Sequence, residues 1–600
     1  MSKSPGYHGC YLRVDLSRDH CERIEIDPRV LRRFIGGSGL GTWLLTRETP
    51  RSEPLDALHP DMPVVIAFSP LIGTPLTTSA KFAMLAKSPL THRINDSLLS
   101  SHFAIAGKKC GCDAIVIVGR ANAPAVLAID DGEARLVDAR RFAGLTAAET
   151  ESRVRDELGR SFQVASIGPA GEREIPFATV SHDGRHAGRG GMGAVFGSKH
   201  LKAIAVRGTR LTTVADADGL VDYARGLSKA SLGPATAKYR ELGTVSNLVT
   251  FNRLGSLPTR NFQQSTFAGA EALALEHAGD MLPRVRSSCA ACTIGCEHIF
   301  SRSGDDSSGV RMEYESLFAL GPLCEVNDRD AVLRAARLCD DAGVDTISSG
   351  GAVAFGMECV ERGLLDEPWL RFGSGEALVR CLSLIARREG VGALLSQGVR
   401  VAAERIGPEA QSFAMHVKGL ELPGYEPRSL QTMALGFAVG TRGADHNRSG
   451  AYQVDFSEET NRLAPDAAAV HRAIETENEA AVMDSLILCK FLRGVFDDRM
   501  AAMAEMLRLV TGFNVDSREL IETAGRIVNA KKRYNILQGW TPDEDRLPSR
   551  VYEQPLPDGV AAGARVTEER MTMLVRQYNT SRGWSPDGWL ADDVTDAAQQ

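Results

Sequence analysis

The pattern of hydrophobic and polar positions divides this chain into two parts. In the first ~210 residues, short apolar runs bounded by Gly, Pro and Asp predict strands at 10–17, 63–69, 113–119, 125–130 and 201–208. Amphipathic patterns predict helices around 29–46 and 145–158. The N-terminal part is therefore expected to be rich in β-structure.

Helical periodicity dominates from about residue 215 onward. Ala/Leu/Arg-rich stretches predict helices at 329–342, 351–363, 376–388 and 497–510. The Pro/Gly-punctuated segment 419–430 divides this helical part in two. The expected fold class is α+β, with a β-rich domain at 1–210 and two mainly helical domains at 211–417 and 418–600.

Composition and charge exclude several classes of protein. The chain of 600 residues has 69 Lys+Arg against 76 Asp+Glu, a net charge of −7, whereas a nucleic-acid-binding protein would show a basic excess. No apolar run reaches the ~18 residues needed to span a bilayer, and the N-terminus lacks the apolar core of a secretion signal. We expect a cytoplasmic protein without nucleic-acid or membrane partners.

Three of the twelve cysteines form the sharpest local motif, a C-x2-C-x3-C trio at Cys289, Cys292 and Cys296. In a cytoplasmic chain such spacing favours a metal site over thiols that merely pack. Three clustered cysteines plus one distant cysteine favour a [4Fe–4S] cluster over zinc, which usually takes two C-x2-C pairs. Spacing alone does not choose the fourth ligand among Cys324, Cys339, Cys359, Cys381 and Cys489.

Two glycine-rich segments, 34–41 and 188–197, invite a nucleotide-binding interpretation. Neither has clean G-x-G-x-x-G spacing after a strand with an acidic residue ~20 positions later. Arg185 and Arg189 flank the second segment, where backbone N–H groups and guanidinium groups could hold an anion together. The alternative is that both segments are tight turns, and the sequence leaves both possibilities open.

A series of motifs in order along nearly the whole chain resembles the tungsten-containing aldehyde:ferredoxin oxidoreductase family. They are YLRVDLS, FIGGSGLG, AKSPLT (86–91), ASIGPAGE (165–172), AGRGGMGAVFGSKHLKAIAV (187–206), the cysteine trio, EYES (313–316), CDDAGVDTIS (339–348), LELPGYEPR (420–428), RGADH (442–446) and DSLILC (484–489). The resemblance implies an N-terminal domain of two β-sheets cradling a metal bound by two pterin dithiolenes, with two helical domains closing over it.

The resemblance also assigns cofactor-binding residues. It selects Cys489 as the fourth ligand of one [4Fe–4S] cluster. The family's pterin motif D-x-x-G-L-D matches 340–345, with Asp340, Val344 in place of Leu, and Asp345. A second copy, D-x-x-G-L-C, matches 484–489, with Asp484, Ile487 in place of Gly, and Leu488.

Charged residues in other motifs are implied to hold the cofactor's phosphates. Arg185 matches a phosphate-binding arginine, with Gly190 and Gly191 following it. Lys81 replaces a family arginine, and Arg448 stands where the family has a lysine near the pterin. A magnesium ion between the phosphates is implied by family likeness, but no ligand for it is assigned here.

Glu315 in EYES and His446 in RGADH match the family's acid/base pair. The implied activity is oxidation of aldehydes to carboxylic acids by a tungsten or molybdenum centre, and the reverse reduction of activated acids. Electrons would leave one at a time through the cluster to ferredoxin or an iron–sulfur partner subunit, and an oligomer or complex is implied.

The alternatives are an iron–sulfur electron-transfer subunit without aldehyde activity and a benzoyl-CoA reductase-type relative. Cys324 is the thiol that could approach the metal as an exception.

Overall fold

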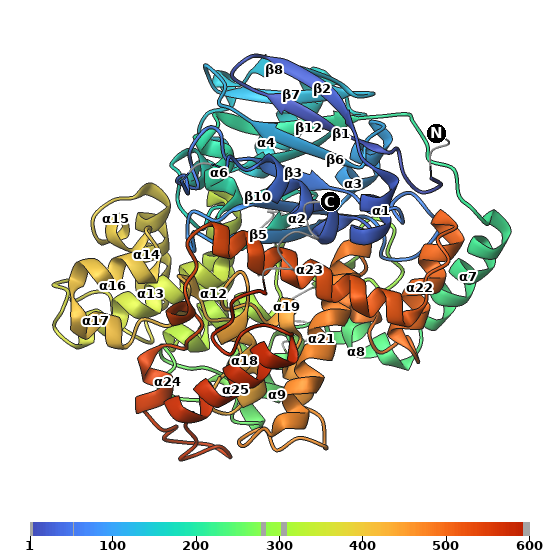
Figure 1. Ribbon diagram of the computed structural model, residues 1–600. Coiled ribbons are helices and arrows are strands. Elements are labelled where there is room, and N and C mark those ends of the chain that lie inside the picture. Colours follow the sequence, from blue (N-terminus) through green and yellow to red (C-terminus); the bar gives the residue numbers. More distant parts are fainter. Residues whose placement is uncertain (1–3, 52, 278–283, 302–308, 592–600) are drawn as a thin grey trace.

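The computed structural model describes residues 4–51, 53–277, 284–301 and 309–591. Two six-stranded sheets form the N-terminal part, at the top of Figure 1. The first has the order β2-β1-β6-β3-β4-β5, with β1 (Cys10–Asp15), β2 (His20–Glu25), β3 (Val64–Ala67), β4 (Lys81–Lys87), β5 (Ile94–Ser100) and β6 (Ala114–Val118). The second has the order β11-β10-β9-β12-β7-β8, with β7 (Ala125–Asp130), β8 (Glu133–Asp138), β9 (Gln163–Ile167), β10 (Val180–His182), β11 (Arg185–Ala187) and β12 (Leu201–Arg207).

Each sheet contains one parallel pair, β1 with β6 and β12 with β7, and its other neighbours are antiparallel. Their facing sides share a core in which Leu12 and Ile117 of the first sheet belong to one cluster with Ile129 and Ile204 of the second. The five strands predicted from apolar runs are confirmed, because these runs fill that core.

The single helix predicted at 29–46 is wrong: the structure has two, α1 (Pro28–Phe34) and α2 (Gly37–Glu48). Positive φ angles at Ile35 (53°) and Gly36 (148°) break the helix. A Cβ atom on Gly37 would lie 2.5 Å from the carbonyl oxygen of Asp484. The first glycine-rich segment is therefore a tight turn whose glycines permit close packing against the chain around Asp484.

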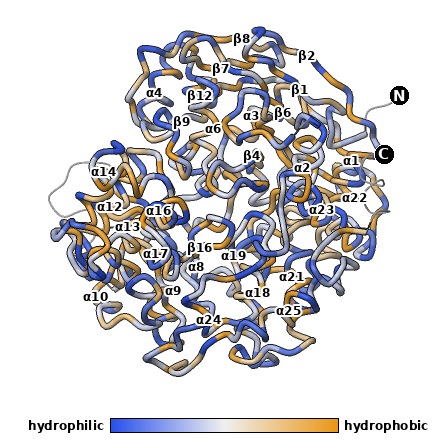
Figure 2. The backbone as a smooth tube through the Cα atoms, turned by 60° about the vertical axis from the view of Figure 1, so that its left-hand side comes forward, coloured by the Kyte–Doolittle hydropathy of each residue, from blue (hydrophilic) through white to orange (hydrophobic). Residues whose placement is uncertain are grey.

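Helices make up most of the remaining chain, and α3 (His102–Lys109), α4 (Ala147–Leu158), α5 (Pro169–Glu172) and α6 (Met192–Ser198) accompany the two sheets. The lower half of Figure 1 is helical, with α13–α17 gathered at the left and α18–α25 below and to the right. The bounds are α7 (Ala217–Ala230), α8 (Pro234–Leu242), α9 (Asn247–Arg253), α10 (Ala270–Leu273), α11 (Tyr314–Leu320), α12 (Arg329–Ala342), α13 (Thr346–Glu361), α14 (Gly375–Arg387), α15 (Val391–Leu395), α16 (Val399–Ile406), α17 (Pro408–Ser412), α18 (Gln431–Val439), α19 (His446–Ser449), α20 (Tyr452–Asp455), α21 (Ala467–Leu486), α22 (Arg499–Thr511), α23 (Ser517–Leu537), α24 (Ser549–Glu553) and α25 (Glu568–Ser581). Figure 2 shows hydrophobic and hydrophilic segments alternating along these helices, as amphipathic packing requires.

Two small sheets complete the architecture. The cysteine trio lies in the connection between β13 (Arg284–Ser287) and β14 (Glu297–Phe300), which pairs with β15 (Val310–Arg311). The turn between β16 (His416–Val417) and β17 (Leu420–Glu421) contains the predicted boundary at 418. In the described part of the chain, no helix has the length and apolar character to cross a membrane.

Candidate functional site

A cavity of about 430 Å³ lies where the sheets meet the helical part, a volume in the range of ligand-binding sites. Strands β4, β5 and β11, the β13–β14 connection, the start of α11, the α12–α13 junction, α19 and the end of α21 contribute to its walls. Most residues singled out in the sequence line it: Lys81, Arg185, Cys289, Cys292, Cys296, Glu315, Asp340, Val344, Asp345, His446, Arg448, Asp484 and Cys489. Gly190, Gly191 and Leu488 lie behind this lining.

Four thiols lie near one another in the cavity lining. The trio and Cys489 are each partly buried and line the same space. Burial and the nearby Cys489 raise the pKa of both Cys292 and Cys296 above the ordinary thiol value. The other four fourth-ligand candidates are buried and do not line the cavity: Cys324, Cys339, Cys359 and Cys381. Among the five candidates, Cys489 is therefore the one that accompanies the trio.

The spacing of these thiols separates two kinds of metal site. Among the residues that the structure describes, one group of three or more His, Cys, Asp or Glu side chains has ligand atoms within 4.8 Å of one another, and it is Glu151, His182 and Asp183. Tetrahedral zinc, with Zn–S bonds of about 2.3 Å, would bring its sulfur ligands within about 4 Å of one another. The four described cysteines form no group of that kind, so their sulfur atoms are not arranged around a single tetrahedral ion.

The two D-x-x-G-like motifs form helix C-termini of the same design. Helix α12 ends at Gly343 (φ 77°), and the Val344 N–H donates to the Cys339 carbonyl at 3.0 Å. Helix α21 ends at Ile487 (φ 66°), and the Leu488 N–H donates to the Met483 carbonyl at 2.8 Å. This bond between residues five apart is typical of a helix closed by a left-handed residue. It delivers the sixth residue of each motif, Asp345 or Cys489, to the cavity wall.

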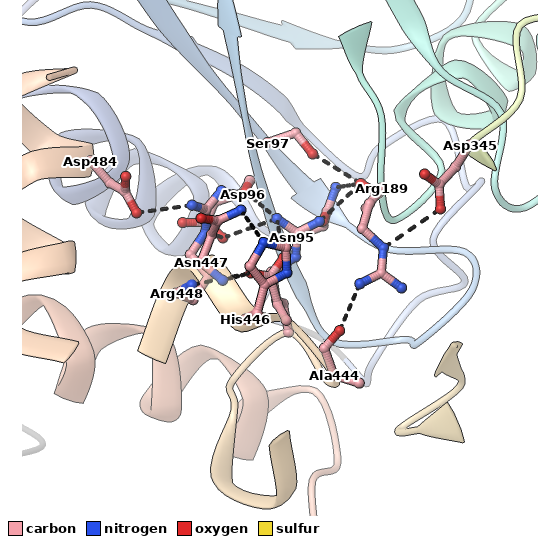
Figure 3. A network of polar contacts seen from close by, with 12 residues as sticks. Asn95, Asp96, Ser97, Arg189, Asp345, Ala444, His446, Asn447, Arg448 and Asp484 are labelled. Atoms are coloured by element: carbon pink, nitrogen blue, oxygen red, sulfur yellow. Dashed lines mark hydrogen bonds and ion pairs between the residues drawn. The ribbon is translucent and has the colours of Figure 1, made fainter. Parts of the chain in front are cut away.

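A buried ion network lies beside the second helix end (Figure 3). Arg448 donates to Asp96 Oδ1 at 3.0 Å and to Asp484 Oδ2 at 2.9 Å. Lys490 Nζ lies 2.8 Å from Asp484 Oδ1, and Lys531 Nζ donates to Asp96 Oδ2 at 2.7 Å. Burial alone would raise the pKa of Asp484, but Lys490 and Arg448 hold that pKa below its ordinary value. The carboxylates therefore stay ionised and fix the cations at the cavity wall.

The second glycine-rich segment is a pair of turns that brings two strands together. Gly190 and Gly191 have φ angles of 86° and 82°. A Cβ atom on Gly190 would lie 2.3 Å from Asn95 Oδ1, and one on Gly191 would lie 2.2 Å from the Pro176 carbonyl. Both positions therefore need glycine for conformation and for space.

Arg185 lies in the cavity wall beside the cysteine trio. Its guanidinium group donates to Glu297 Oε2 at 2.8 Å and to Glu313 Oε1 at 3.1 Å. Burial alone would lower its pKa, but Cys289 and the two glutamates raise it above the ordinary value. Arg185 therefore stays cationic beside the trio, while Arg189 is the cation on the glycine-rich segment itself.

Glu315 and His446 lie next to each other in the cavity lining. Glu315 Oε2 accepts the Gly424 N–H at 3.0 Å, while its Oε1 lies 3.5 Å from His446 Nδ1. The Tyr425 ring stacks on the imidazole with centroids 4.7 Å apart. Glu315 Oε1 and His446 Nδ1 are both buried and have no hydrogen-bond partner among the described residues. Two unsatisfied polar atoms this close together could both contact one ligand oxygen placed beside them.

The surroundings determine the charge state of this pair. Burial raises the pKa of Glu315 to about 8, and burial lowers the pKa of His446 to about 4. At neutral pH the imidazole is neutral and most Glu315 carboxyls carry a proton. The Asn447 amide nitrogen lies 2.9 Å from His446 Nε2, and since an amide nitrogen only donates, the ring proton belongs on Nδ1.

Three features of the site were not identified from the sequence. The Thr78 N–H donates to the Ala291 carbonyl at 2.7 Å, and the Thr78 hydroxyl accepts the Cys489 N–H at 3.2 Å, so one residue joins the trio to its partner. Asn95 donates to the Arg189 carbonyl at 3.1 Å, and the guanidinium group of Arg189 reaches Ala444. No local pattern marks these roles, since each depends on a neighbour more than 90 positions away.

Cys324, considered from the sequence as an exceptional metal ligand, lies outside the cavity lining. Its Sγ atom is 3.6 Å from the carbonyl oxygens of Ala319 and Gly350. Burial raises its pKa above the ordinary thiol value, so it stays a protonated packing residue.

Comparisons with known proteins agree with this architecture. Residues 11–208 match the family model described as aldehyde ferredoxin oxidoreductase, N-terminal domain, and residues 225–596 match its domains 2 and 3. The tungsten-containing aldehyde ferredoxin oxidoreductases of Pyrococcus abyssi and Pyrococcus furiosus are each 34% identical, over 98% and 97% of both chains. An aliphatic sulfonate oxidoreductase, WOR-like subunit, of Pyrococcus furiosus is 28% identical over 98% of this chain and 96% of its own.

Among solved structures, a chain of the active-site complex BamBC of benzoyl coenzyme A reductase, in complex with 1,5-dienoyl-CoA, has the same fold. It has a TM-score of 0.83 and 22% identity, and the match covers 100% of this chain and 97% of the other. The two sheets and helical parts of that fold were expected from the motifs, and the family models cover them almost completely. The chain belongs to the aldehyde ferredoxin oxidoreductase family.

Proposed function

We propose that this protein is a tungsten-dependent oxidoreductase that oxidises aldehydes to carboxylic acids and passes the electrons to ferredoxin or an iron–sulfur partner subunit. The observation that carries the proposal is the pair Glu315 Oε1 and His446 Nδ1, which lie 3.5 Å apart without a hydrogen-bond partner in a cavity that four thiols also line. Family membership supports the reaction class.

The lining suits the group that such an enzyme needs. Cys289, Cys292, Cys296 and Cys489 would hold the [4Fe–4S] cluster. The remaining lining offers cations for phosphates and carboxylates for pterin N–H groups, namely Lys81, Arg185, Arg189 and Arg448 with Asp340, Asp345 and Asp484. When bound, the metal–pterin group would accept the two electrons released as RCHO and H₂O become RCOOH and two protons, and the cluster would carry them away singly.

The acid/base pair would manage the protons of this reaction. The His446 Nδ1–H has no hydrogen-bond partner among the described residues, and a neutral imidazole would donate it to the aldehyde oxygen as negative charge develops. Glu315 is fixed through Oε2 by Gly424, which leaves Oε1 to take a proton from the attacking water. In the reverse direction the same carboxyl would return that proton.

The pKa of Glu315 then gives the two directions opposite pH dependence. Oxidation needs ionised Glu315, so its rate should rise about tenfold per pH unit below pH 8 and level off above it. Acid reduction needs the protonated form, so its rate should fall above pH 8. The neutral state of His446 is constant over this range because its pKa is about 4.

Metal analysis combined with one substitution tests the proposal. The purified chain should contain about one tungsten and four iron atoms, and aldehyde should reduce a one-electron dye. Glu315→Gln keeps an acceptor for the Gly424 N–H but cannot take a proton, so turnover should fall by ~10²–10⁴-fold with metals retained. Iron without tungsten, or parental turnover in the fully loaded variant, would contradict the proposal.

A further inference from the structure

Arg189 reaches from the glycine-rich segment toward Ala444 and Asp345 (Figure 3). One terminal nitrogen donates to the Ala444 carbonyl at 2.7 Å, and the other donates to the Glu421 carbonyl. Its Nε lies 3.5 Å from Asp345 Oδ2. The side chain is 10% exposed and lines the cavity.

One carbonyl that Arg189 holds lies close to His446 along the chain, and the other begins a segment that is hydrogen-bonded to Glu315. Ala444 is two residues before His446. Glu421 begins the segment that reaches Gly424, whose N–H holds Glu315 Oε2 at 3.0 Å. A guanidinium group is planar and its N–H directions are fixed, so it sets the separation of two carbonyl groups that it bridges.

The backbone of Arg189 is itself fixed. Its carbonyl oxygen accepts hydrogen bonds from Asn95 Nδ2 at 3.1 Å, from Ser97 Oγ at 2.9 Å and from an Arg442 terminal nitrogen at 3.2 Å. These three donors come from β5 and from the segment before α19. The guanidinium group therefore acts from an anchored base, and the anchor joins the sheet domain to the helical part.

We propose that Arg189 is a positioning residue that sets the distance between Glu315 and His446, because it bridges the segment that leads to His446 and the segment whose Gly424 N–H holds Glu315. The proposal rests on the acid/base roles given above, and it adds that the spacing is controlled from the glycine-rich segment. Asp345, at the end of a predicted pterin motif, completes the contacts of the same side chain.

The charge of Arg189 provides a second readout. Burial raises the pKa of Glu315, while the Gly424 N–H and Arg189 lower it and the carboxylates of Asp445 and Asp345 raise it. Burial lowers the pKa of His446, Asp445 raises it, and cations lower it further, namely Arg189, Arg493 and Arg448. Removing the positive charge at position 189 should therefore raise the pKa values of both Glu315 and His446. A substitution that keeps a positive charge there should leave both pKa values unchanged.

Two substitutions separate geometry from charge. Arg189→Lys keeps the charge but cannot bridge two carbonyls with a planar fork, so kcat should fall ~10–100-fold while the pH inflection near 8 stays in place. Arg189→Met should lose as much rate and also move the inflection upward. Arg462→Met is the matched control, because Arg462 also bonds a distant carbonyl, that of Leu254 at 2.7 Å, but does not line the cavity.

Measurements on the full chain without metals keep the test independent of turnover. Carbon-13 NMR of labelled histidine, with the His446 signal assigned by its loss in His446→Asn, should show a higher imidazole pKa in Arg189→Met than in Arg189→Lys or the parent. If the parent oxidises no aldehyde, the proposed function fails, but this titration still tests Arg189. Parental kcat per tungsten in both variants would overturn the positioning role, and so would an unchanged His446 pKa in Arg189→Met.

Discussion

Two helix ends meet at the cavity with the same backbone and different chemistry. Residues 340–345 close α12 and residues 484–489 close α21, each through a left-handed fourth residue and the bond between residues five apart. The sixth residues then diverge. Asp345 caps the next helix by accepting the Ser348 N–H at 3.0 Å, whereas the Cys489 thiol accompanies the cysteine trio. The same backbone conformation therefore presents a carboxylate at one helix end and a thiol at the other. The identity of the sixth residue determines which group each helix end contacts.

The first residues of the two motifs differ in burial. The Asp340 side chain is 37% exposed and its Oδ1 lies 3.2 Å from His186 Nε2. The Asp484 side chain is 2% exposed and holds both Arg448 and Lys490. The Asp340 carboxylate is therefore more open to solvent, while Asp484 is held by two cations within a buried ion network in the cavity wall.

Replacing Cys489, the thiol at the end of α21, should have the largest effect on cluster content and activity. We expect Cys489→Ala to lose the reduced-cluster EPR signal and nearly all aldehyde-dependent dye reduction, because three thiolates leave one corner of the cluster without a protein ligand. Iron analysis and EPR measure the first effect directly.

Cys381→Ala is the matched control, since Cys381 is fully buried in α14 and does not line the cavity. It should retain four irons per chain. A normal cluster in Cys489→Ala would place the fourth ligand elsewhere and would remove the main chemical difference between the two helix ends.

The burial contrast predicts the next largest effect. Asp484→Asn leaves Arg448 and Lys490 without a shared carboxylate, and breaking a buried pair in this way costs about 3–5 kcal/mol of unfolding free energy. Asp340→Asn removes a partly exposed contact and should cost at most about 1 kcal/mol. Denaturant unfolding of the two variants at matched metal content measures the difference.

The same contrast should depend on pH with a defined sign. The folded-state pKa of Asp484 is below the ordinary 3.8, so its contribution is present above that pH and is lost as pH falls through the folded-state pKa. Burial lowers the pKa of Lys490 to about 7, so the difference between parent and Asp484→Asn also changes near neutrality. Below the ordinary aspartate pKa of 3.8 the difference should narrow, and a gap that widens there would contradict the buried-network interpretation.

Sequence reasoning reached the parts of this site that depend on local pattern. The apolar runs predicted the strands because those side chains fill the core between the sheets, and cysteine spacing identified the trio because its members share one turn. It failed at 29–46, where the break between α1 and α2 is set by contact of Gly37 with Asp484. That contact joins positions more than 400 residues apart, and no local window contains it.

The roles of Arg189 and Thr78 were missed for the same reason. An arginine in a glycine-rich segment predicts an anion site, and only the fold shows that its guanidinium group is directed to the carbonyls of Glu421 and Ala444. The assignments of Glu315 and His446 came from family motifs, and their roles stay predictions. The structure adds that they face each other with unpartnered atoms.

Replacing Ile487, the fourth residue of the α21 motif, should change stability less, because it relieves backbone strain but removes packing. Ile487 stands at the glycine position of the D-x-x-G-L-C motif that this segment resembles, and a left-handed β-branched residue is strained by about 1–2 kcal/mol. Its side chain is fully buried, so deleting it should cost about 2–5 kcal/mol. Ile487→Gly should therefore destabilise the protein by a net ~1–3 kcal/mol in denaturant unfolding, although it restores the family residue. A more stable variant would mean that strain outweighs packing here.

The smallest effect isolates the left-handed conformation that the two helix ends share. Ile487→Ala and Ile487→Gly both delete the packed side chain, so their difference reports the cost of a Cβ atom at a positive φ, about 1 kcal/mol. Gly343→Ala should show at least that cost at the other helix end, because φ is 77° there. The total cost of Gly343→Ala should exceed the Ile487 difference, because the added Cβ would lie 3.0 Å from the Gly168 nitrogen and 3.1 Å from its Cα. Both are backbone atoms that cannot rotate away. Equal costs at both ends would mean that the Gly168 backbone yields freely and the ends differ in side chains alone. A cost at Gly343 below the Ile487 difference would show that the two backbones are not equivalent.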